Sequence, residues 1–187
     1  MTTALLPTIS RPPTAVPAPA SNVGCAVTAL QFRDAMSQIT TPVSIITTDG
    51  PAGRSGMTCS AVCAASDTPP MILACVHSAS AANRVFKANG VLCVNSLNAS
   101  QNHLSQLFAS SRGVPMEERF ATEDWCTLAT GAPYHRNALV AVDCEVLDIR
   151  EAGTHSVFFA KVLATGFGEP LDPLVYHRRA YATTRTL

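Results

Sequence analysis

Residues 56–98 read GMTCSAVCAASDTPPMILACVHSASAANRVFKANGVLCVNSLN, and this stretch decides the fold. It contains three apolar runs typical of β-strands, at Met57–Ala65, Met71–Val76 and Val91–Leu97. Before the third run, a Ser-x-Ser start predicts a helix over Ser80–Asn89, which Gly90 ends. Hydroxyl-bearing residues thus follow a glycine at the head of one strand and also open a helix. Such an arrangement suits a planar ring held against backbone amides, with a phosphate at the helix N-terminus.

The rest of the chain continues this mainly β pattern. Strand-like runs dominate, and no regular alternation of strand and helix is present, which argues against a doubly wound parallel sheet. We therefore expect a small antiparallel barrel with short peripheral helices. The further expected elements are helices at Thr28–Ile39 and Ser100–Ala109 (capped by Ser100), a strand over 42–48, an irregular stretch over 110–137, a hairpin of Ala138–Arg150 and His155–Thr165 turning at Gly153, and a last strand at Leu174–Tyr181.

Length and composition bound the class of protein. A chain of 187 residues fits one domain, which we expect over residues 25–187 after a disordered Pro/Ala/Thr-rich extension over 1–24. The net charge is zero and only 14% of residues are charged, so nothing suggests nucleic acid or an anionic membrane surface as a partner. Thin surface charge favours coverage by another subunit. No run is long enough to span a membrane and no signal peptide is visible, which favours the cytoplasm.

Seven cysteines are present, an odd number without C-x-x-C spacing. Cys63, Cys75 and Cys93 lie inside apolar runs, so we expect buried free thiols rather than disulfides or a metal site. The glycines of GPAGRSG (50–56) have the wrong spacing for a G-x-G-x-x-G fingerprint and precede a strand, so no Rossmann domain is predicted. No hydrolase or metal motif is found either. Glu117, Glu118 and Arg119 fit solvated charge, and Trp125 fits the core.

The first candidate site is the segment from Thr58 to Ala61. Thr58 and Ser60 would present hydroxyls on one face of a strand, with the backbone amides of Cys59 and Ala61 nearby, to the polar edge of a ring such as a flavin. Ordinary period-two strand polarity explains the same residues without a ligand. The residues alone leave both interpretations open.

The second candidate is the turn before the predicted helix at Ser80. His77, Ser78 and Ser80 are followed by Asn83 and Arg84, and a phosphate at the helix start would meet amides, hydroxyls and a countercharge from Arg84 or Lys87. Simple capping explains one of the two serines, but not both together with Arg84. A third candidate, His155 beside the Gly153 turn, is by itself typical of a surface histidine.

The motifs GMTCSAV, SDTPP, FKANGVLCVN, MEERF and GTH together resemble the short-chain NADH:flavin oxidoreductases. These are the flavin reductase components of two-component aromatic monooxygenases, including those acting on 4-hydroxyphenylacetate, phenol and chlorophenols. The resemblance implies a flavin-binding, Greek-key-like split β-barrel that forms a homodimer. It also implies NADH-dependent reduction of free FAD or FMN, with the reduced flavin diffusing to a separate oxygenase that hydroxylates a phenolic or chlorophenolic compound.

The resemblance also assigns expected roles to residues. The strand at Thr58–Ala61 would contact the flavin ring, the turn from His77 to Ser80 with Asn83 and Arg84 would hold its phosphate, and His155 would orient NADH as the catalytic residue. Pro42, Ser60 and Ala61 would leave room for the nicotinamide. Tyr176 and Arg178, with Arg179, match a Y-x-R-R ending that contacts either a nucleotide or a dimer partner. A non-catalytic flavin storage or sensor protein of the same fold is the alternative function.

Overall fold

The computed structural model describes residues 27–109, 113–121 and 124–184, so the predicted extension over 1–24 and Cys25 lie outside the described residues. Its main element is a seven-stranded sheet of order β3-β2-β6-β9-β10-β5-β4, in which every neighbouring pair is antiparallel. The strands are β2 (Ser44–Thr48), β3 (Ser55–Cys59), β4 (Val62–Asp67), β5 (Pro70–His77), β6 (Val91–Ser96), β9 (Val140–Ala152) and β10 (His155–Phe167).

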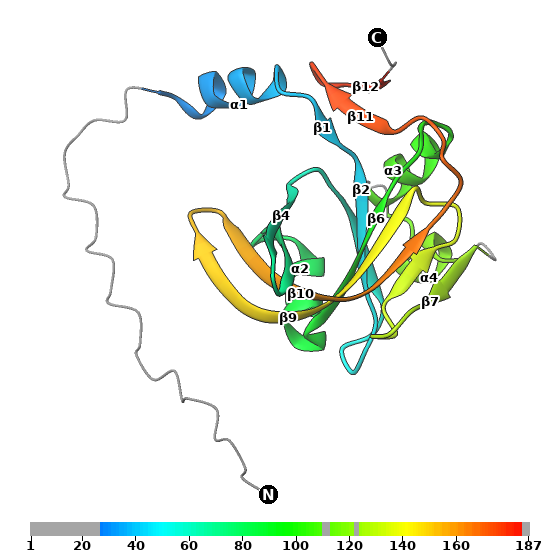
Figure 1. Ribbon diagram of the computed structural model, residues 1–187. Helices are drawn as coiled ribbons and strands as arrows, with labels where there is room; N and C mark the ends of the chain where they lie inside the picture. The colour runs from blue at the N-terminus through cyan, green and yellow to red at the C-terminus, as the bar shows by residue number, and fades with distance from the viewer. Residues whose placement is uncertain (1–26, 110–112, 122–123, 185–187) are drawn as a thin grey trace, which may run out of the picture.

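A short link forces this sheet to curl. The two edge strands, β3 and β4, are consecutive in the chain and are joined only by Ser60 and Ala61. Three peptide units reach at most about 11 Å, whereas the edges of a flat seven-stranded sheet would lie roughly 29 Å apart. The sheet must therefore bend until its edges approach each other, as the curved strands of Figure 1 show. The ladder stays open between β3 and β4, which makes the barrel split and confirms the predicted fold class.

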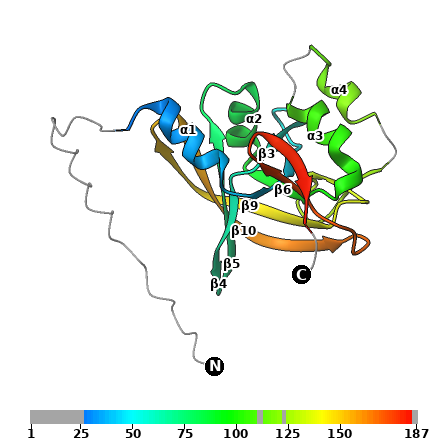
Figure 2. The same cartoon turned by 90° about the horizontal axis from the view of Figure 1, so that it is seen from above.

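Smaller elements surround the barrel. A three-stranded sheet of order β1-β11-β12 and a two-stranded sheet, β7-β8, complete the strands. Helices α3 and α4 gather at the end of the molecule away from the tip of the β9–β10 hairpin (Figures 1 and 2). The helices outside the main sheet are α1 (Ala29–Ser37), α2 (Ala81–Asn89), the 3₁₀ turn η1 (Ala99–Gln101), α3 (Asn102–Ala109) and α4 (Met116–Arg119). The strands outside it are β1 (Thr41–Pro42), β7 (Trp125–Thr127), β8 (Pro133–His135), β11 (Leu174–His177) and β12 (Ala180–Thr183).

Two apolar clusters hold the helices against the sheet. Phe86 of α2 packs edge-on against Phe158 of β10 inside the curl of the barrel. On the side of α3 and α4, Phe108, Phe120 and Trp125 form an aromatic cluster with ring centroids 4.8–5.5 Å apart. Trp125 therefore belongs to the core, as predicted. Burial of these rings supplies most of the driving force for docking the short helices, which are too short to be stable alone.

Several predicted elements have different boundaries in the structure. The run Met57–Ala65 is not one strand, because the chain leaves β3 at Cys59 and enters β4 at Val62. The helix predicted from Ser100 starts with η1, and its cap is Asn98, whose side chain accepts from the backbone N–H of Ser100. The stretch 110–137, predicted to be irregular, contains α4, β7 and β8. Cys63, predicted to be buried, is exposed on the edge strand β4.

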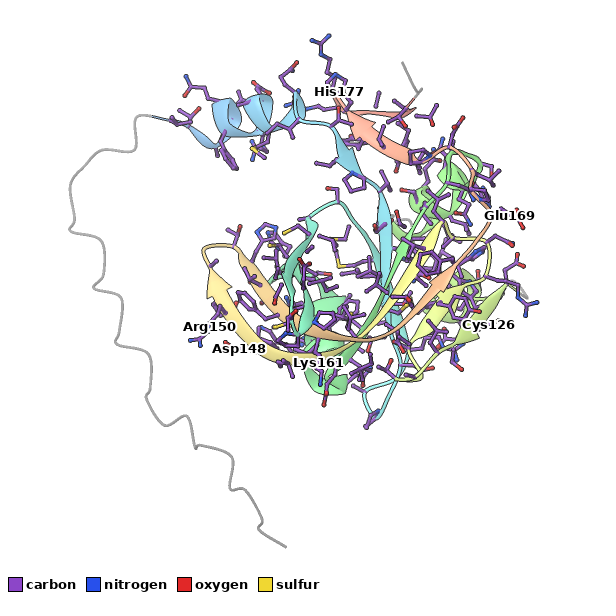
Figure 3. The ribbon with its side chains drawn as sticks, in the orientation of Figure 1. Cys126, Asp148, Arg150, Lys161, Glu169 and His177 are labelled. Atoms are coloured by element: carbon purple, nitrogen blue, oxygen red, sulfur yellow. The ribbon has the colours of Figure 1, made fainter. Side chains whose placement is uncertain are left out.

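The last predicted strand, Leu174–Tyr181, is in fact a hairpin. Arg178 and Arg179 form its turn with φ angles of 49° and 62°, a left-handed conformation that sequence reasoning assigns to Gly or Asn rather than to two arginines. Contacts with α1 hold them there. The backbone N–H of Arg178 donates to the carbonyl of Ser37 at 2.7 Å, and the Arg179 guanidinium pairs with Asp34. His177 at the end of β11, labelled in Figure 3, lies 3.2 Å from the hydroxyl of Thr40.

Helix α1 is confirmed where it was predicted, but it buries none of its residues. Thr28 caps it in a capping box with Gln31. Within the residues that the structure describes, no helix is long and apolar enough to cross a membrane.

We expect Gly56→Ala to destabilise the fold by about 1–3 kcal/mol, because there is no room for a methyl group. A Cβ at Gly56 would lie 2.8 Å from Cε1 of Phe108 and 3.2 Å from Cζ of Phe120, so the aromatic cluster would have to shift. Gly166→Ala is the matched control, since its Cβ would meet nothing closer than 3.7 Å. Urea unfolding of both variants measures the difference, and equal stabilities would contradict the predicted clash.

Candidate functional site

A cavity of about 620 Å³ opens beside β3, between the start of α2 and the end of α3. Its volume lies in the range typical of sites for small molecules and cofactors. Its walls combine apolar side chains with a few hydroxyls. The described residues that line it are Val43, Gly56, Met57, Thr58, Ser60, Ser80, Ala81, Ala82, Phe108, Ala109, Met116, Arg119, Tyr176 and Tyr181.

Four of the predicted site residues line this cavity, namely Thr58, Ser60, Ser80 and Tyr176. The structure thus brings the first and second candidate segments to one place, although they lie on different elements. The hydroxyl of Thr58 donates to the carbonyl of Ser105 at 2.6 Å, so it ties β3 to α3. Ser60 is exposed in the two-residue link between β3 and β4.

The start of α2 forms one end of the cavity. Ser80 is the N-cap, but its side chain makes no capping hydrogen bond, and its hydroxyl lies 3.9 Å from the sulfur of Met57. The first helical residues, Ala81 and Ala82, also line the cavity. The N-terminal amides of a helix carry partial positive charge and have no partners within the helix, so this end of the cavity suits an anion.

Two predicted site residues have their side chains in the core instead. The Asn83 amide donates to the carbonyl of Val76 at 3.2 Å and to the hydroxyl of Ser156 at 3.0 Å, so it fastens α2 to the sheet. Cys59 is buried, which raises the pKa of its thiol to about 11 and keeps it protonated at neutral pH. Neither side chain lines the cavity, so the prediction that they contact a flavin is restricted to their backbones.

His155 and His77 meet edge-on beside the start of α2, with ring centroids 5.1 Å apart. They are register partners on β10 and β5, and the carbonyl of Thr154 accepts from the N–H of Ser78 at 2.9 Å. Neither histidine lines the cavity itself. The backbone N–H of Ser80 bonds to the His77 carbonyl at 3.0 Å, which sets this pair one turn away from the cavity wall. The catalytic role of His155 stays a prediction.

Glu151 connects the hairpin tip with α2. Its carboxylate accepts from Lys87 at 2.7 Å, from Ser156 at 2.9 Å and from Ser78 at 3.4 Å. The hydrogen bond from Lys87, followed by that from Ser156, lowers the pKa of this carboxyl. Lys87 and Ser78, both predicted to hold a phosphate, are therefore engaged with Glu151 in this structure.

The remaining predicted residues lie outside the cavity lining. Pro42, Ala61 and Arg84 are exposed, and the guanidinium of Arg178 donates through Nε to the side chain of Gln38 at 2.9 Å. Arg178 thus holds helix α1, a role that neither predicted alternative included. Tyr176 does line the cavity, and it packs against Tyr181 with ring centroids 5.5 Å apart.

Ten of the fourteen described lining residues were not among the predicted site residues. Phe108 and Ala109 come from α3, Met116 and Arg119 from α4, and Tyr181 from β12. Arg119 was expected to be solvated charge, but it is half-buried at the cavity wall. No local sequence pattern marks these residues, because only tertiary packing brings α3, α4 and β12 to the cavity.

Comparison with known proteins identifies the family. Residues 36–185 match the model of the flavin reductase like domain. The chain belongs to this family. It is 46% identical over 156 residues to an FMN reductase (NADH) RutF of Ancylobacter novellus. The matched region covers 83% of this chain and 85% of that protein.

Solved structures agree. BorF, the flavin reductase component of a bacterial two-component tryptophan halogenase, superposes with a TM-score of 0.79 at 30% identity, covering 86% of this chain and all of BorF. The flavin reductase PheA2 gives a TM-score of 0.77 at 26% identity, with the same coverages of 86% and 100%. The predicted family, fold class and enzyme class, an NADH:flavin oxidoreductase, are confirmed.

We expect Glu151→Ala to raise the KM for NADH by roughly two- to fivefold while kcat changes less, because the hairpin carrying His155 loses its tie to α2. The pKa of Glu151 lies below its ordinary value of 4.5, so the carboxylate is present at all pH values above that and its contribution is lost only as pH falls further. The effect should therefore be constant between pH 6 and 8.

Glu145→Ala on the same strand is the control, since Glu145 is exposed and lies outside this network. Steady-state kinetics of both variants decide the matter. A Glu151→Ala enzyme that matches Glu145→Ala would show that the network does not position the hairpin.

Proposed function

We propose that this cavity is the flavin site of the reductase, with the ring against β3 and the phosphate at the start of α2, and that the reduced flavin leaves for a separate oxygenase component. The observation that carries the proposal is the meeting of Thr58, Ser60 and Ser80 at a single cavity. These residues come from a strand, a link and a helix N-cap. The Thr58 hydroxyl also bonds to the Ser105 carbonyl, whereas the Ser80 hydroxyl makes no capping hydrogen bond.

The residues present fit such a ligand. Val43, Met57, Phe108 and the two tyrosines supply apolar and aromatic surface suited to a planar ring, while Ser80 and the first amides of α2 supply donors suited to a phosphate. When bound, the flavin would accept a hydride from NADH, which requires little acid–base help from the protein. The chain's own residues would bind and orient the two ligands and exclude water between them.

Release of the reduced flavin is supported by the character of the walls. The lining is largely apolar and hydroxylic, which favours binding weak enough for a diffusible product. BorF and PheA2 are flavin reductases, and BorF serves a two-component system, which supports an oxygenase partner here. The phenolic or chlorophenolic substrate of that oxygenase, and the cytoplasmic location, stay predictions. FMN is the flavin named for the RutF relative, so we expect FMN to be used at least as well as FAD.

The alternative of a non-catalytic flavin storage protein is disfavoured by the high identity to an NADH-dependent FMN reductase. The two functions predict different results, since a storage protein would bind flavin without oxidising NADH.

We expect NADH oxidation by the purified protein only after flavin is added, and we expect Ser80→Asp to raise the KM for FMN at least about tenfold. The new carboxylate would repel a phosphate at the helix start. Aspartate is itself a good N-cap, so the variant should fold as well as the parent protein. Following NADH absorbance at varied FMN concentration gives both results.

Ser66→Asp on β4 is the matched control, because Ser66 lies outside the cavity lining and its hydroxyl accepts from the N–H of Thr68. If the KM for FMN is unchanged in Ser80→Asp, the flavin phosphate does not bind at the start of α2. Flavin binding without NADH oxidation in the parent protein would favour the storage function.

We also propose that the protein is a homodimer in which a second copy covers α1. Leu30 and Phe32 of this helix are 59% and 58% exposed, and the helix buries no residue in the single chain. Isolated helices of this length are only marginally stable in water. Burial of the apolar side chains against a second copy would stabilise α1.

Replacing both Leu30 and Phe32 with serine should shift the protein toward monomer in light scattering, whereas Leu171→Ser, at an equally exposed leucine in the loop before β11, should not. A parent protein that is monomeric at all concentrations would rule out the proposed dimer.

A further inference from the structure

The turn between β11 and β12 consists of residues that backbone preference does not favour. His177 pairs with Ala180, so the loop between the two strands is Arg178 and Arg179 alone. Both have positive φ angles, 49° and 62°, in the region that favours glycine or asparagine in two-residue hairpin turns. Residues persist in such conformations where the surrounding contacts over-determine them. The contacts of the two side chains therefore explain why arginine stands at these positions.

Both arginine side chains bind helix α1. Arg178 donates through Nε to the side chain of Gln38, the C-cap of α1, at 2.9 Å, and the Arg179 guanidinium pairs with Asp34. The backbone N–H of Arg178 also donates to the carbonyl of Ser37 at 2.7 Å, so the turn lies against the end of α1 (Figure 1). Neither arginine is among the described residues that line the cavity. A Gly-Asn turn would relieve the backbone but would lack the two side-chain contacts.

The strand positions next to this turn carry part of the cavity wall. Tyr176 and Tyr181 are register partners, one pair away from the turn, and both line the cavity. Their rings pack edge-on with centroids 5.5 Å apart. The Tyr181 hydroxyl lies 2.8 Å from that of Ser105, a fully buried residue of α3. The hairpin is thus attached to α1 at its turn and to α3 through Tyr181, and the tyrosine pair lies next to both attachments.

We propose that Arg178 and Arg179 are positioning residues, which fix the turn on α1 and thereby hold the rings of Tyr176 and Tyr181 in place against the ligand. The inference rests on the proposed placement of the flavin in this cavity. A two-residue turn sets the twist of the strands that it joins, so a displaced turn moves the adjacent tyrosine pair most. Contact between aromatic rings depends on their orientation, so this displacement weakens the binding of a planar ring whether or not it carries a phosphate.

Charge reversal tests the contact with α1 without weakening the turn. In Arg179→Asp the new carboxylate repels Asp34, while aspartate tolerates the left-handed conformation better than arginine does. Thermal unfolding should therefore show a variant as stable as the parent protein. Quenching of flavin fluorescence, without NADH, gives the Kd for FMN and for riboflavin, which lacks the phosphate. Both Kd values should rise by the same factor, about three- to fivefold, while kcat at saturating flavin changes less than about twofold.

The swapped pair is the rescue experiment. Arg179→Asp combined with Asp34→Arg restores an ion pair of opposite polarity, so both Kd values should return to within about twofold of the parent values. Arg150→Asp is the matched control, because Arg150 forms a similarly exposed pair with Asp148 on β9. Figure 3 shows this pair away from His177 and the turn, so Arg150→Asp should leave both Kd values unchanged.

Three results would overturn the proposal. The first is that Arg179→Asp leaves both Kd values unchanged, and the second is that the swapped pair does not restore them. The third is weaker binding of FMN alone, because that pattern would mean that Arg179 contacts the phosphate directly.

A further variant, Tyr176→Ala, separates this inference from the proposed function. If Tyr176→Ala weakens the binding of both flavins and Arg179→Asp does not, the cavity is the flavin site and the contact with α1 does not position its wall. If neither Tyr176→Ala nor Ser80→Asp changes flavin binding, the cavity is not the flavin site, and the proposed function and this inference fail together.

Discussion

The link of Ser60 and Ala61 is the constraint on which the rest of the structure depends. It joins the two edge strands of a seven-stranded sheet, so the sheet cannot lie flat and its edges must approach each other. The backbone N–H of Cys75 donates to the carbonyl of Ala61 at 2.9 Å, which fastens the link to β5 just as the chain changes edges.

The cavity follows from this closure. Because the ladder is open between β3 and β4, the outer edge of β3 has no neighbouring strand in the main sheet, and the helices α2 and α3 contact β3. The side chains of β3 that line the cavity then lie between two helix ends, one an N-terminus and the other followed by α4 with Arg119. Thr58 ties β3 to α3 through the Ser105 carbonyl, so a residue of the cavity wall also holds these two elements together.

Sequence reasoning recovered most strands of the main sheet and the Gly90 and Gly153 turns, and it pointed to two segments, at Thr58 and Ser80, that reach one cavity, because period-two patterning and capping are local signals. It missed the break after Cys59. The apolar run continues through this point, and only long-range strand pairing places β3 and β4 at opposite edges of the sheet. It missed the hairpin turn at Arg178 and Arg179, where contacts with α1 override backbone propensity. Phe108, Arg119 and Tyr181 reach the cavity by tertiary packing alone, so no local pattern marks them.

The distribution of positive charge bears on how tightly the proposed site would bind a nucleotide. Lys87 is paired with Glu151, Arg54 with Asp49, and Arg179 with Asp34, so these cations serve the fold. Each charge-assisted contact to a phosphate contributes about 1.5–3 kcal/mol, and every 1.4 kcal/mol lengthens the residence time about tenfold if the association rate is unchanged. Under our proposal, a nucleotide in the cavity would meet mainly apolar side chains, hydroxyls and the N-terminal amides of α2. Such binding would be weak enough to let the product leave, as the proposed supply of a separate oxygenase would require.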